Sequence, residues 1–103
     1  MKIEVHRQAC SAQDDQMGPL SHAYALPDQC SIEDLLHAVV ASRFLQFSST
    51  HTQMRCLVAG KAVATVFSPY AVPARETVFD IPPDTVLRSI ATNPEAEFVF
   101  DRI

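Results

Sequence analysis

The chain has 103 residues, of which 48% are hydrophobic and 19% are charged, and its formal net charge is −4. This length and composition predict one globular domain over residues 1–103 and exclude a disordered chain. The acidic balance and the eight scattered Lys and Arg residues argue against a nucleic-acid partner, because a phosphate-binding surface needs clustered basic side chains.

The start of the chain predicts two strands separated by a long loop. Met1, Ile3 and Val5 alternate with polar residues, which is the pattern of a half-buried strand. The same alternation leaves no apolar core for a secretion signal, and no run approaches the roughly 20 apolar residues of a membrane span. We therefore expect a cytoplasmic protein without membrane contact. Polar residues 8–20 predict the loop, and residues 21–27 predict the second strand.

The stretch CSIEDLLHAVV predicts a helix from about Ile32 to Phe44. Ser31 and Asp34 fit a capping box, in which each side chain accepts a hydrogen bond from the backbone amide of the other residue. Four apolar residues repeat on one helical face and predict its buried side: Ile32, Leu35, Leu36 and Val39.

The second half of the chain predicts a hairpin followed by minor elements and a last strand. Residues 53–67 form the hairpin, with a tight turn at Gly60-Lys61. Its second strand is almost continuously apolar, so it is either buried on both faces or an edge that another segment covers. The remaining predictions are a loop over 68–76, a short strand over 77–81, a short helix over 82–91 and a strand over 97–103.

Strands around one main helix predict an α+β fold, with the helix on one face of a mixed sheet. We expect the last strand to pair in parallel with the first, which would protect both chain ends from fraying. The element order resembles that of the ubiquitin-like β-grasp family. LPDQCSIEDLLHAVV is similar to that family's turn and helix start. The family's third-strand pattern, Gln-x-Arg-x-aliphatic-apolar-Ala-Gly-Lys, is matched by Gln53, Arg55, Leu57, Val58, Ala59, Gly60 and Lys61.

The resemblance implies a β-grasp domain without the family's conjugation chemistry. Conjugation and sulfur transfer need a C-terminal Gly-Gly, whereas the only glycines here are Gly18 and Gly60. We therefore expect a protein that is not conjugated. The β-grasp ferredoxins hold an iron–sulfur cluster with four thiolates, and this chain has three widely spaced cysteines. We expect no cofactor.

The Cys and His residues do not form a recognisable catalytic or metal-binding set. The helix N-terminus would lower the thiol pKa of Cys30 somewhat, but Cys30 and His37 point in different directions. His6 and His22 are expected on opposite faces of the sheet. No C-x-x-C spacing is present, and we expect three reduced thiols, one of them packed as a small hydrophobic residue. These are Cys10, Cys30 and, as the packed residue, Cys56.

A protein-binding face is predicted on the third strand. In the β-grasp register that the resemblance implies, Arg55 and Leu57 lie on the sheet face opposite the helix. Leu57 flanked by Arg55 and Lys61 resembles the apolar patch with a basic rim by which ubiquitin-like folds meet partners. The predicted protein-binding residues are therefore Arg55, Leu57 and Lys61. Residues 68–94 leave two interpretations open, since they could instead fold over this face and make Leu57 a core residue.

We therefore expect a non-catalytic protein-interaction module whose partner is an unidentified protein. The apolar strand over residues 62–67 could also mediate homodimerisation. Two alternatives remain. One is a small enzyme in which His6, Cys10 and a nearby acid act together. The other is a small immunity or antitoxin-type protein, whose acidic charge would suit a basic toxin.

Overall fold

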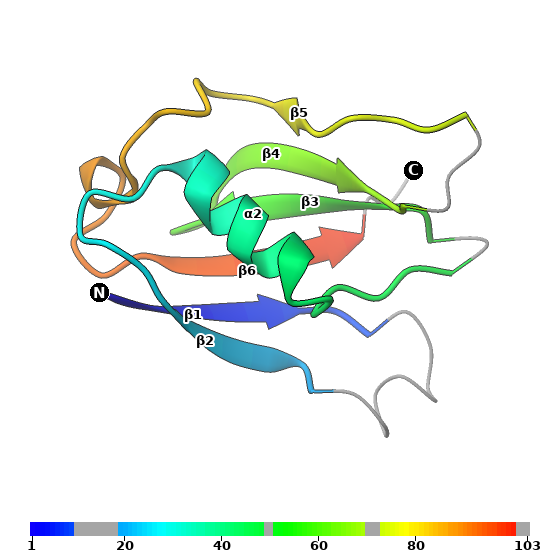
Figure 1. The fold of residues 1–103 in the computed structure, drawn as a ribbon, viewed down its shortest axis with the longest axis horizontal. Helices are drawn as coiled ribbons and strands as arrows, with labels where there is room; N and C mark the ends of the chain where they lie inside the picture. The colour runs from blue at the N-terminus through cyan, green and yellow to red at the C-terminus, as the bar shows by residue number, and fades with distance from the viewer. Residues whose placement is uncertain (10–18, 49–50, 70–72, 101–103) are drawn as a thin grey trace.

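One helix lies across one face of a six-stranded mixed sheet, so the predicted α+β class is confirmed (Figure 1). The computed structural model describes residues 1–9, 19–48, 51–69 and 73–100. Most of the predicted loop over residues 8–20 and the end of the last predicted strand lie outside these ranges. The elements in chain order are β1 (Lys2–Arg7), β2 (Ser21–Ala25), α2 (Ile32–Ala41), β3 (Gln53–Val58), β4 (Lys61–Phe67), β5 (Val78–Phe79), a 3₁₀ turn η1 (Leu87–Ser89) and β6 (Glu95–Phe100).

The strand order across the sheet is β2-β1-β6-β3-β4-β5. β1 and β6 are interior strands that pair in parallel, as predicted for the first and last strands, and every other neighbouring pair is antiparallel. Two elements from opposite ends of the chain therefore lie side by side within the sheet (Figure 1).

The core lies between α2 and the sheet. Alternate residues of β1, β3 and β6 point toward the helix and are buried, which follows from the two-residue period of a strand. The helix contributes the four residues of its predicted apolar face. The fully buried side chains that fill the core include Ile3, Val5, Ile32, Leu35, Val39, Met54, Cys56, Val58 and Phe98.

The helix begins as predicted but ends three residues earlier, at Ala41. At its start, the Asp34 amide donates to Ser31 Oγ over 3.1 Å, and the Ser31 amide donates to Asp34 Oδ2 over 2.9 Å. This is the predicted capping box. At its end, Arg43 has a φ of 58°, which no helical residue adopts. Since Phe44 then turns into the core, the predicted end at Phe44 is wrong.

The β3–β4 hairpin closes through a two-residue turn at Ala59-Gly60, one position before the predicted turn. Ala59 and Gly60 have φ values of 52° and 80°. Positive φ at both central residues is typical of the type I′ turn, whose twist matches that of the strands. Lys61 is consequently the first residue of β4 and pairs with Val58.

The predicted helix over residues 82–91 is mostly wrong, because only the 3₁₀ turn η1 forms there. The backbone of this segment pairs with the start of α2 instead. The amides of Ile32 and Glu33 donate to the carbonyls of Thr85 and Pro83, each over 3.0 Å. These amides have no partner within the helix, so the neighbouring segment satisfies them. Leu87 is fully buried as a result.

Candidate functional site

The sheet face away from α2 carries two of the three predicted binding residues. In β3, Met54, Cys56 and Val58 are fully buried under the helix. Arg55 and Leu57 alternate with them and lie on the opposite, open face, where Arg55 is exposed and Leu57 is half-buried. The alternation in the sequence predicted this division, because a strand has only two faces.

Lys61 does not lie on that face. Residues directly opposite each other in an antiparallel pair point to the same side of the sheet. Lys61 pairs with Val58, whereas Leu57 pairs with Ala62. Lys61 is therefore an exposed residue on the helix side of the hairpin. It does not belong to the face that carries Arg55 and Leu57. The sequence interpretation missed this because it placed the turn one residue too late.

Three further strands bring neighbours to Arg55 on the open face. The register places Val99 of β6 and Thr65 of β4 on either side of Arg55, and Val78 of β5 beside Thr65. Val78 is 50% exposed. We call these five residues the open-face patch: Arg55, Leu57, Thr65, Val78 and Val99. Val99 and Val78 were not predicted, since their place depends on pairing between distant segments.

An acidic strip borders the open-face patch on the side of β1 and β6. Glu4 pairs with Glu95, and Glu97 stands between His6 on β1 and Leu57 on β3. All three glutamates are exposed. We call Glu4, Glu95 and Glu97 the acidic strip. The predicted basic rim is therefore replaced by a mixed one, with Arg55 inside the patch and acidic residues beside Leu57.

The described part of residues 68–94 extends the sheet and does not bury the patch. β5 pairs with Ala64 and Thr65 at the outer edge of β4, and the following residues run past the start of α2 (Figure 1). Arg75 reaches the open side, with its guanidinium carbon 4.1 Å from the centroid of the Phe67 ring. Leu57 remains half-buried, so it is a surface residue and not a core one.

The pairing with β5 also affects the edge on which the predicted homodimer relied. In addition to the two strand pairs, the Asp80 amide donates to the Val63 carbonyl over 2.9 Å. The middle of β4 therefore already has a hydrogen-bonding partner on that side. Dimerisation along residues 62–67 stays a prediction.

The two described cysteines are buried. Burial raises the pKa of the Cys56 thiol to about 12. Burial also raises the pKa of Cys30, and the nearby carboxylate of Asp34 raises it further. The expected lowering of the Cys30 pKa is therefore wrong, because desolvation outweighs the helix N-terminus. Cys10 lies outside the described residues, so the proposed grouping of Cys10 with His6 has no structural description.

Histidines and acids do not gather into a metal site within the described ranges, where no group of three or more such ligands converges. His6 pairs with Ser21, and His22 pairs with Val5. The two histidines therefore face opposite sides of the sheet, as predicted. His37 is exposed on α2, away from the buried Cys30. In the part of the chain that is described, no helix is long and apolar enough to cross a membrane.

Comparisons with known proteins found no matching family model, no matching curated protein and no matching solved structure.

Proposed function

We propose that the chain is a β-grasp domain of the ubiquitin-like kind that acts as a non-catalytic protein-interaction module. The strand order supports the fold proposal, since the parallel first and last strands lie side by side within the sheet and, in the described part of the chain, one helix covers one face. The tight Ala59-Gly60 turn falls inside the segment that resembles the family's third strand.

The open-face patch carries the functional proposal. Leu57 is only half-buried and Val78 is half exposed, although both belong to paired strands. Apolar side chains gathered on a sheet face and rimmed by charge are typical of protein-binding surfaces. Arg55 lies between Val99 and Thr65, and arginine with apolar neighbours is enriched where interfaces contribute most to affinity.

The acidic strip indicates which charge the surface of the partner carries. A partner seated on Leu57 also meets Glu97, which pairs with Leu57 across the strands. The best complement is therefore an apolar surface with basic residues along one side. Such rim charges mainly raise the association rate and set the orientation of binding, while the apolar contact supplies most of the affinity.

The test is an affinity capture with three forms of the chain: wild type, Leu57→Asp and His37→Asp. His37 is exposed on α2, so His37→Asp adds the same charge on the opposite face. The proposal expects a partner retained by wild type and His37→Asp and lost by Leu57→Asp. Circular dichroism must show that Leu57→Asp is folded. A folded Leu57→Asp variant that retains every partner would contradict the proposal.

One observation favours a second function, that of a small immunity or antitoxin-type protein that neutralises a basic partner. Glu4 and Glu95 face each other across neighbouring strands, a placement that costs stability through like-charge repulsion. Three glutamates on one flat face would suit a basic partner. In that case, replacing the three glutamates of the acidic strip with Gln abolishes binding of the basic partner. Binding also weakens steeply with salt, and the Leu57→Asp variant still binds.

A further inference from the structure

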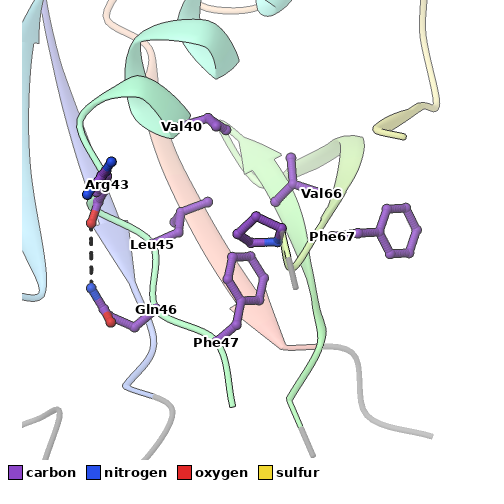
Figure 2. A pocket seen from close by; sticks show the side chains of 8 residues that line it. Val40, Arg43, Leu45, Gln46, Phe47, Val66 and Phe67 are labelled. Atoms are coloured by element: carbon purple, nitrogen blue, oxygen red, sulfur yellow. Dashed lines mark hydrogen bonds between the residues drawn. The ribbon is translucent and has the colours of Figure 1, made fainter. Parts of the chain in front are cut away.

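A pocket of about 460 Å³ opens between the end of α2 and the end of β4, away from the open-face patch. Its walls are mainly apolar. Figure 2 shows Leu45, Phe47 and Val66 around one hollow, with Arg43 beyond Leu45 at its rim and the ring of Phe67 pointing away from it. Pockets of about 300 to 1,000 Å³ with apolar walls and few polar groups are typical of small-molecule sites.

One wall of this pocket exposes a large apolar side chain. Val40, near the end of α2, lines the pocket and is 57% exposed, whereas Val39 beside it is fully buried. Val66 also lines the pocket but is almost fully buried. An apolar molecule in the hollow would therefore remove exposed apolar surface from water, which is the main source of affinity in such sites.

Among the residues that the structure describes, one positively charged side chain lines the pocket. Of the described residues around it, Arg43 is the one that carries a charge. Within residues 1–9, 19–48, 51–69 and 73–100, no acidic side chain forms an ion pair with Arg43. An anionic group of a ligand would therefore complement the charge of Arg43. A guanidinium can bind a carboxylate through two parallel hydrogen bonds.

The backbone at Arg43 is unusual for an arginine. Its φ of 58° lies in the left-handed region, where glycine is the favoured residue after a helix end. The Gln46 side-chain amide donates to the Arg43 carbonyl over 3.5 Å and supports this turn (Figure 2). Strain held at a position beside a pocket is a recurrent feature of binding sites.

We propose that this pocket binds a small monocarboxylate with an apolar body. The aliphatic or aromatic body fills the hollow between Val40, Leu45 and Val66, and the carboxylate pairs with the guanidinium of Arg43. This site is separate from the proposed protein-binding function, because it lies at the ends of α2 and β4 and shares no lining residue with the open-face patch.

The test titrates the protein with hexanoate, octanoate and decanoate below their micelle concentrations, and with the corresponding alcohols, by isothermal calorimetry. Each pair of added methylenes is expected to tighten binding about fifteenfold until the pocket is full, at about fourfold per methylene. Each carboxylate is expected to bind at least about tenfold tighter than its alcohol, because only the carboxylate pairs with the guanidinium. Absence of saturable binding, or equal binding of acid and alcohol, overturns the proposal.

Two variants separate the charge from the fold. Arg43→Gly removes the guanidinium and suits the positive φ, so it is expected to raise the denaturant midpoint while weakening octanoate binding about tenfold and leaving octanol binding unchanged. Lys61→Gln removes one positive charge at the hairpin tip and is expected to leave octanoate binding unchanged. Unchanged octanoate binding by Arg43→Gly, or an equal loss with Lys61→Gln, overturns the assignment.

The location is checked with methyl NMR spectra during the octanoate titration. The methyl signals of Val40, Leu45 and Val66 are expected to shift, while those of Val78 and Val99 stay in place. Shifts confined to Val78 and Val99 would place the ligand on the open-face patch and overturn the pocket assignment.

Discussion

The buried thiol of Cys56 makes the stability of the protein fall at alkaline pH. The side chain is fully buried on the helix side of β3, and burial raises its pKa from 9.0 to about 12. A raised pKa means that the folded state holds the proton more tightly than the unfolded state. The corresponding stability is fully present below pH 9 and is lost as the pH rises toward 12. At pH 10.5 the loss amounts to about 2 kcal/mol.

The variant Cys56→Ala removes the titrating group. It is expected to be less stable than wild type at pH 7.5, because it leaves a small cavity. Between pH 7.5 and 10.5, however, its free energy of unfolding should fall by about 2 kcal/mol less than that of wild type. Tyr24 and Cys30, whose pKa values burial also raises, are present in both proteins, so their effects cancel.

The assay is urea unfolding followed by circular dichroism at pH 7.5, 9.0 and 10.5, with a phosphine reductant to keep all thiols reduced. The slope of unfolding free energy against urea must be the same for both proteins, so that midpoints can be compared. Equal losses of stability in wild type and Cys56→Ala would refute the reasoning. They would mean that the Cys56 thiol is hydrated in the folded protein.

Three further substitutions test the fold by urea unfolding. Ser31→Ala removes the capping hydroxyl of α2 and is expected to cost about 1 kcal/mol, whereas no loss would mean that the cap is not populated. Tyr24→Phe removes the hydroxyl that lies 2.6 Å from Ser42 Oγ and should cost about 1 kcal/mol, with little further loss in the double variant with Ser42→Ala. Leu87→Ala should cost about 2 to 5 kcal/mol, and a loss below 1 kcal/mol would contradict the packing of the 82–91 segment on the core.

The features predictable from the sequence are those with a short-range period or cap. The alternation of Ile3 and Val5 indicated β1, and Ser31 with Asp34 indicated the start of α2, because both signals lie within four residues. The alternation in β3 likewise separated the buried Cys56 from Leu57 on the open face.

The features that were missed depend on contacts between distant segments or on unusual backbone conformations. The sequence does not mark Arg43 as a residue with positive φ, so the helix end was placed at Phe44. Residues 82–91 have some helical character, but the carbonyls of Pro83 and Thr85 accept hydrogen bonds from the amides that start α2. Those amides lie at least 50 positions earlier in the sequence. A one-residue shift of the hairpin turn moved Lys61 to the wrong face, since each such shift reverses a strand's faces.

The proposal that the open-face patch binds a protein is tested most directly by methyl NMR of the labelled chain with its captured partner. Binding at the patch predicts that the methyl signals of Leu57, Val78 and Val99 shift or broaden, while those of Val40 and Leu45 at the α2 pocket keep their positions. If Val40 and Leu45 respond and Leu57 does not, the partner binds the helix side and the proposed function is wrong.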